Sequence, residues 1–135
     1  MRKIVSKWLY LPILLTGLTL AAIGCKKDAK TPDRDKFLGT YSVAQDCSGQ
    51  ANTYDITIAV SSASEDAVVI NNFYNLGING LNATVNGDNI TIPSQVINNI
   101  TFTGNGSISG TILTLNYTLA NGAASVSCTG ICTQK

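Results

Sequence analysis

The sequence predicts an all-β protein, an antiparallel up-and-down barrel of about eight strands. Apolar residues alternate with Thr, Asn and Ser at a period of two through most of the chain after residue 36, and no stretch there has the apolar period of a helix. Turn sequences such as Asn121-Gly122 separate the alternating stretches. Closing the sheet into a barrel removes exposed strand edges, whereas a two-sheet β-sandwich is the alternative.

Each expected strand has one apolar face. The faces, in chain order, are Phe37, Gly39, Tyr41 and Val43; Tyr54, Ile56, Ile58 and Val60; Val68 to Ile70; and Leu81, Ala83 and Val85. They continue with Ile90 and Ile92 after the turn at Gly87-Asp88; Ile100 and Phe102, leading through Gly104-Asn105-Gly106 to Ile108; Leu113, Leu115, Tyr117 and Leu119; and Ala124, Val126 and Cys128. An eight-stranded barrel is just wide enough for its own side chains or one small ligand, so we expect a largely filled interior.

The longest irregular stretch of the predicted barrel lies between the third and fourth strands. It places Phe73, Tyr74, Leu76 and Ile78 in a loop. Binding residues concentrate in loops at the mouths of barrels, so these four are the candidate contacts for a small apolar ligand. The alternative is that Phe73 plugs one end of the barrel.

Residues 1–24 have the three parts of a secretory signal peptide. A basic head at Met1-Arg2-Lys3 precedes an apolar stretch from Trp8 to Leu20 and small residues before Cys25. The ending Ala22-Ile23-Gly24-Cys25 resembles the lipobox of bacterial lipoproteins. A transmembrane helix is the alternative, but the apolar stretch is shorter than the ~20 residues that span a bilayer.

The lipoprotein resemblance implies that Cys25 becomes the first mature residue and carries a diacylglycerol thioether and an N-acyl chain. Two or more acyl chains give stable membrane anchoring. Residues 25–36 are mostly charged and are expected to form a solvated tether to the barrel domain at 37–135. Lys26 resembles the outer-membrane sorting class, so we expect a lipid-anchored envelope protein, either periplasmic or exposed at the cell surface.

The charge pattern excludes several functions for the predicted barrel. After Phe37 there is no His or Arg, and Lys135 is the one lysine, so nucleic-acid binding has no cations to support it. Without His, neither a Ser-His-Asp triad nor a Cys-His pair can form. The acids are expected at ordinary turn and strand-end positions; they are Asp46, Asp55, Glu65, Asp66 and Asp88. We therefore expect no enzyme activity and no cofactor.

Three cysteines follow Cys25, and an extracytoplasmic location favours a disulfide. The first and last strands of an up-and-down barrel are neighbours, so strand parity favours a bond between Cys47 and Cys128 that closes the barrel. A Cys47–Cys132 bond remains the next choice. A zinc site is disfavoured, because three thiols leave tetrahedral coordination incomplete.

The segment Phe37-Leu38-Gly39-Thr40-Tyr41 resembles the Gly-x-Trp opening of calycin and lipocalin-like barrels, with Tyr41 in place of the tryptophan. Together with Val69 to Phe73 and Ile90 to Gln95, it looks like small lipocalin-like lipoproteins of Gram-negative bacteria. That resemblance implies a barrel with a ligand mouth. The alternative function is an envelope interaction module whose Thr- and Asn-rich outer faces contact glycans or proteins.

Overall fold

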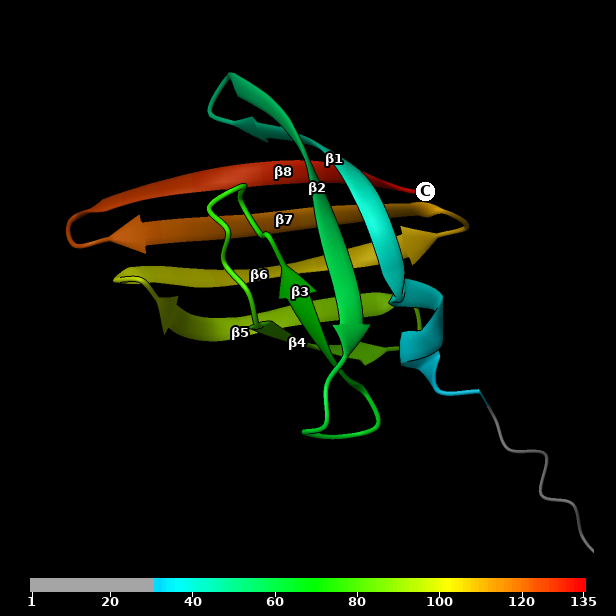
Figure 1. The fold of residues 1–135 in the computed structure, drawn as a ribbon. Coiled ribbons are helices and arrows are strands. Elements are labelled where there is room, and N and C mark those ends of the chain that lie inside the picture. The colour runs from blue at the N-terminus through cyan, green and yellow to red at the C-terminus, as the bar shows by residue number, and fades with distance from the viewer. Residues whose placement is uncertain (1–30) are drawn as a thin grey trace, which may run out of the picture.

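The computed structural model describes residues 31–135 (Figure 1). The predicted signal peptide at 1–24 and the acylated Cys25 lie outside these residues. A short 3-10 helix precedes eight strands: η1 (Asp33–Phe37), β1 (Gly39–Cys47), β2 (Gln50–Val60), β3 (Ala67–Asn71), β4 (Leu81–Asn86), β5 (Asn89–Ile97), β6 (Ile100–Ser109), β7 (Ile112–Asn121) and β8 (Ala124–Gln134).

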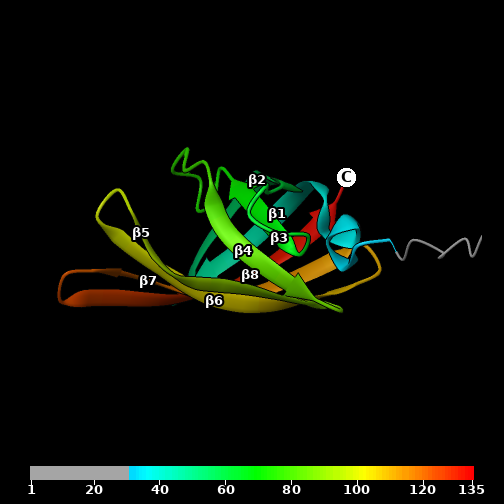
Figure 2. The ribbon, with the colours of Figure 1, turned by 90° about the horizontal axis from the view of Figure 1, so that it is seen from below.

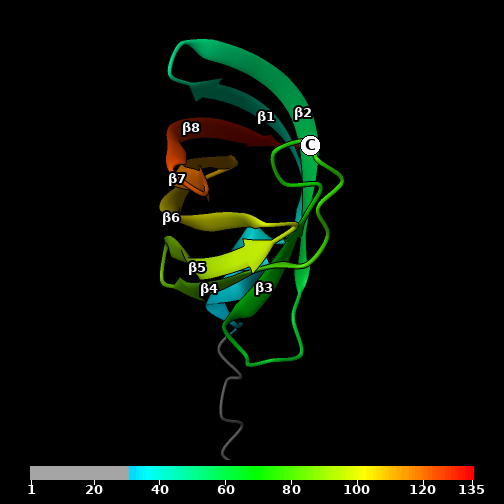
Figure 3. The same ribbon diagram turned by 90° about the vertical axis from the view of Figure 1, so that its left-hand side faces the viewer.

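The eight strands form a closed barrel in sequence order, and every neighbouring pair is antiparallel. Closure occurs where β1 pairs with β8, with Tyr41 opposite Gln134 and Cys47 opposite Cys128. The predicted fold class is confirmed. Figure 3 shows β8, β7, β6 and β5 stacked along one wall, with β2 and β3 along the other.

The barrel wall is loose between β4 and β5. These strands pair only from Thr84 to Thr91, and a register shift interrupts β5 between Ile92 and Gln95. The Gln95 amide replaces the missing strand pairing, because its Oε1 accepts from Asn82 N at 2.9 Å and its Nε2 donates to Asn82 O at 2.8 Å. Beyond this point the β5–β6 and β7–β8 hairpins project past the body of the barrel (Figure 2).

The predicted inward faces fill the interior. One contiguous cluster of buried apolar residues includes members of η1, of every strand and of the loop between β3 and β4. Its largest fully buried side chains include Phe37, Tyr41, Phe73 and Phe102. Two predicted inward residues depart from the expected pattern. Val60 is 51% exposed, because it ends β2 where the chain leaves the barrel, and Ala124 is exposed at the start of β8.

Two glycines of β6 let it lie very close to β7. A Cβ on Gly104 would lie 2.6 Å from Asn116 O, and one on Gly106 would lie 2.3 Å from Thr114 O. No side chain fits at those distances. Gly104 and Gly106, in the middle of β6, therefore allow the backbones of β6 and β7 to approach closely.

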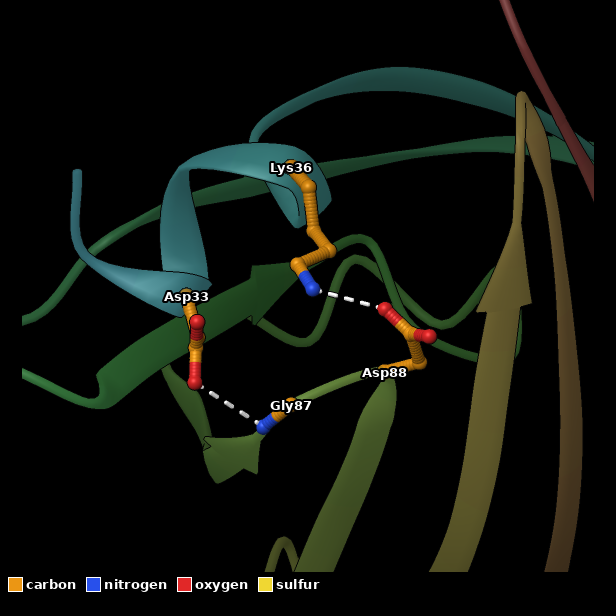
Figure 4. Close-up of polar contacts among 4 residues, drawn as sticks. All are labelled: Asp33, Lys36, Gly87 and Asp88. Carbon is orange, nitrogen blue, oxygen red and sulfur yellow. Dashed lines mark hydrogen bonds and ion pairs between the residues drawn. The ribbon is translucent and has the colours of Figure 1, made fainter. Parts of the chain in front are cut away.

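Part of the predicted tether belongs to the folded domain. Asp33 Oδ2 accepts a hydrogen bond from Gly87 N at 3.0 Å, and Lys36 Nζ lies 2.6 Å from Asp88 Oδ1 (Figure 4). Arg34 Nη1 donates to the carbonyl oxygens of the β2–β3 connection, at 2.8 Å to that of Ser64. Three of the charged residues expected to be solvated, Asp33, Arg34 and Lys36, therefore have partners on the barrel. Residues 25–30 lie outside the described part of the chain.

Phe37 anchors the end of η1 in the barrel core. Its side chain is fully buried, and its carbonyl oxygen accepts from the Tyr41 hydroxyl at 2.9 Å. Phe37 thus ends η1 instead of opening the first strand. We call this end of the barrel the tether end; the far end carries the β1–β2, β5–β6 and β7–β8 hairpins and the loop at 72–80.

Candidate functional site

The four predicted ligand contacts lie at the far end, but the structure divides them into two pairs. Phe73 and Ile78 face each other across an isolated β-bridge and are 1% and 2% exposed. Tyr74 is half-buried, and Leu76 is 49% exposed. Positive φ at Asn72, among other loop residues, bends the chain tightly enough to turn Phe73 inward.

Phe73 closes the far end of the interior. Its ring packs edge-on against Phe102 at 5.9 Å and against Tyr117 at 4.7 Å between ring centroids. Phe73 and Ile78 are therefore core residues, the outcome set out above as the plug alternative. Of the four predicted contacts, Tyr74 and Leu76 remain accessible to a partner.

Tyr74 and Leu76 border an outward-facing hollow of about 410 Å³. The hollow lies between the β1–β2 hairpin and the loop at 72–80. Its lining consists of uncharged residues: Gln45, Cys47, Gln50, Ala51, Asn52, Tyr74, Asn75 and Leu76. Amide side chains dominate this lining, so the hollow offers hydrogen-bond donors and acceptors without a net charge.

A buried hydrogen-bonded group lies beside this hollow. Gln45 points into the barrel and is 6% exposed, the one buried polar side chain of residues 31–135. Its Oε1 accepts from the Tyr54 hydroxyl at 2.8 Å and also from the Tyr117 hydroxyl. The two hydroxyl oxygens lie 3.4 Å apart. Within the described chain, the Gln45 amide nitrogen has no hydrogen-bond partner, but it is accessible to solvent, because Arg34 Nε is the one fully buried side-chain atom of residues 31–135 without a partner.

The hydrogen-bonded group of Gln45, Tyr54 and Tyr117 stays neutral near physiological pH. Burial raises the pKa of both the Tyr54 and the Tyr117 phenol, so neither ionises. Sequence reasoning missed Gln45. Its position in the alternation could have revealed it. Every second residue of β1 points inward, and Gln45 lies between the inward residues Val43 and Cys47.

The structure contains a disulfide between Cys47 and Cys128, the pairing that strand parity favoured. Their Cα atoms are 4.2 Å apart across the β1–β8 closure, and 81 residues separate them in sequence. Cys132 is a free, fully buried thiol, and burial raises its pKa to about 12. A thiol in this environment is protonated and unreactive.

Four of the predicted turn and strand-end acids, Asp46, Asp55, Asp66 and Asp88, make local or paired contacts at separate places on the surface. Asp46 Oδ1 accepts from Gly49 N at 2.9 Å in the β1–β2 turn, and the hydrogen bond from Ser64 lowers the pKa of Asp66. Asp55 pairs with Lys135 at 2.6 Å, as Asp88 does with Lys36. Residues 31–135 contain no group of three His, Cys, Asp or Glu side chains placed to hold a metal ion.

A second hollow, of about 460 Å³, lies on the outer face of β6, β7 and β8. Thr, Asn and Ser side chains line most of it, with Asp46 and Ser48 contributed by the β1–β2 hairpin. In one cross-strand row Asn105 lies opposite Asn116, which lies opposite Thr129. Thr129 Oγ1 donates to Asn116 Oδ1 at 3.0 Å. This face is polar and nearly uncharged.

The described residues thus define a closed eight-stranded barrel with a filled interior and polar hollows on its outside, of which the one beside Gln45 has an uncharged lining. No protein-family model matches the chain, and no curated protein matches it. Among solved structures, it is similar to a crystal structure from Bacteroides fragilis described as a "putative outer membrane protein", with 17% identity and a TM-score of 0.46. The match covers 78% of this chain and 53% of the other, so this chain spans about half of that protein's length. No helix within residues 31–135 is long and apolar enough to cross a bilayer.

Proposed function

We propose that this chain is a lipocalin-like envelope lipoprotein, anchored in the outer membrane through acyl chains on Cys25, whose barrel is a non-enzymatic interaction module. One observation carries the proposal. The barrel's own side chains occupy its interior, while the polar hollows open outward. A filled barrel favours contact through its surface over enclosure of a ligand.

The position of η1 supports an anchored orientation. A hydrogen bond and an ion pair hold η1 against the β4–β5 hairpin at the tether end. The seven residues between Cys25 and Asp33 span at most about 25–30 Å when extended. An anchor on Cys25 would therefore keep the tether end nearer the bilayer and leave the far end, with its amide-lined hollow, for a partner.

Cys25→Ala is expected to abolish acylation and release the protein from the membrane fraction. Metabolic labelling with a fatty-acid analogue, followed by fractionation, measures both effects. Cys132→Ala is the matched control, because Cys132 is buried in the barrel and should leave labelling unchanged. Label that persists on the Cys25→Ala protein would rule out the lipoprotein assignment.

A small apolar ligand at the far end is the second candidate function. It is supported by the half-exposed Leu76 beside Tyr74 and by an apolar hollow of about 200 Å³ lined in part by Ile100, Leu119 and Val126. This candidate predicts that an environment-sensitive apolar dye binds saturably and that Leu76→Ser weakens binding. Ile112→Ser, at an exposed site at the tether end, is the control. Absence of saturable binding would eliminate this candidate and favour the interaction module.

A further inference from the structure

We infer that the hollow at the far end beside Gln45 is a binding site for a neutral saccharide. This inference rests on the proposed interaction module and names its site and its partner class. It starts from the buried amide of Gln45 and proceeds to the side chains around the opening.

The two tyrosines fix the orientation of the Gln45 amide. Both hydroxyls donate to Oε1, so the carbonyl end of the amide faces the barrel interior. The nitrogen is the other arm of the same planar amide, and Gln45 is among the residues that line the hollow. Its two N–H donors have no partner in the described chain, and because the nitrogen is not fully buried, a ligand in the hollow can reach them.

An inward Gln in an otherwise apolar series is unusual, and its nitrogen can bond only to solvent in the hollow, because that atom is not fully buried and has no partner in the described chain. Satisfying the tyrosines alone explains the carbonyl end of Gln45 but not the nitrogen. A ligand that accepts hydrogen bonds in the hollow would complete the group.

The rim of the hollow determines the class of ligand. Gln50, Asn52 and Asn75 are exposed amides, each with donors and an acceptor, and they line the same hollow as the half-buried Tyr74. Sugar hydroxyls donate and accept hydrogen bonds, and the C–H face of a sugar ring can pack on an aromatic side chain. A saccharide matches both features.

Charge excludes the main competing ligands. None of the lining residues is charged, so the hollow lacks the Arg and Lys groups that hold phosphates and carboxylates. The buried phenols add no charge, because burial raises the pKa of Tyr54 and Tyr117. The volume, about 410 Å³, lies in the range of small-molecule sites, which suits a short oligosaccharide.

The test uses the protein purified from the membrane in detergent and isothermal titration with neutral hexasaccharides of glucose, mannose, xylose and N-acetylglucosamine. At least one should bind saturably. Asn52→Ala and Asn75→Ala change exposed side chains and should each weaken binding by about three- to tenfold, the effect of one lost hydrogen bond. Asn79→Ala, an exposed residue of the same loop outside the hollow, should leave binding unchanged.

Gln45→Met tests the base of the hollow, with near-ultraviolet circular dichroism as the check that the barrel stays folded. A folded Gln45→Met protein should lose saccharide binding by more than either rim variant. Retained binding in that protein, or equal weakening by Asn79→Ala, would overturn the site.

Binding to unglycosylated peptides and to none of the saccharides would also overturn the saccharide site, while leaving the proposed interaction module in place. The proposed membrane anchor is tested separately. If the wild-type protein carried no fatty-acid label, the anchor would be ruled out. The two proposals can therefore fail independently.

Discussion

Replacing Cys47 and Cys128 together by alanine is expected to lower the free energy of unfolding by about 4 kcal/mol. The disulfide joins residues 81 positions apart, and closing so long a loop removes much of the conformational freedom of the unfolded chain. It also ties β1 to β8 at the far end of the closure, where strand pairing alone would otherwise hold the barrel shut. Urea denaturation followed by far-ultraviolet circular dichroism measures the loss.

Cys132→Ala is the matched control for the disulfide. It removes a buried sulfur but no cross-link, so we expect a loss of about 1 kcal/mol. Adding a reductant should shift the wild-type midpoint toward that of the double variant and leave the double variant unchanged. Equal midpoints for the double variant and Cys132→Ala would show that the bond contributes no stability.

Phe73→Ala is expected to lower the free energy of unfolding by about 3–5 kcal/mol. Phe73 is 1% exposed and packs edge-on against Phe102 and Tyr117, so its removal leaves a cavity at the closed far end. The surrounding strands are joined in a closed barrel and cannot collapse freely into that space. Thermal and urea unfolding both measure the effect.

Leu76→Ala is the control for Phe73, because both residues lie in the loop at 72–80 and differ in burial. Leu76 is 49% exposed, so we expect its truncation to change stability by less than about 0.5 kcal/mol. If Phe73→Ala unfolded at the same urea concentration as Leu76→Ala, Phe73 would not be part of the core.

The strand order and the inward faces could be predicted from sequence because their signal is local. In β7, for example, Leu113, Leu115 and Tyr117 alternate with polar residues, and each is buried. The alternation also gave the parity that favoured the Cys47–Cys128 bond. Local alternation cannot show which side of a loop faces inward, so Phe73 and Leu76 looked equivalent in sequence.

The Gln45 group depends on contacts that sequence patterns do not contain. Tyr54 is nine residues from Gln45 and Tyr117 is 72, and the three side chains meet only through the register of the closed barrel. The same limit applies to η1, whose charged residues look solvated in sequence. Their partners, Gly87 and Asp88, are 54 and 52 residues away from Asp33 and Lys36.

The attachment of η1 to the barrel has a mechanical consequence if Cys25 is the anchor. A pull between the bilayer and the far end acts first on the exposed Lys36–Asp88 ion pair and on the Asp33 hydrogen bond, which are weak. Once these contacts and the hydrogen bonds from Arg34 to the β2–β3 connection are broken, residues 33–36 are free and the extended tether gains about 13 Å. Further extension has to extract the fully buried Phe37, which resists strongly. The chain next to the barrel therefore extends at low force by the length of residues 33–36 and then resists further extension at Phe37. The distance of the far end from the bilayer would depend on the force applied to it.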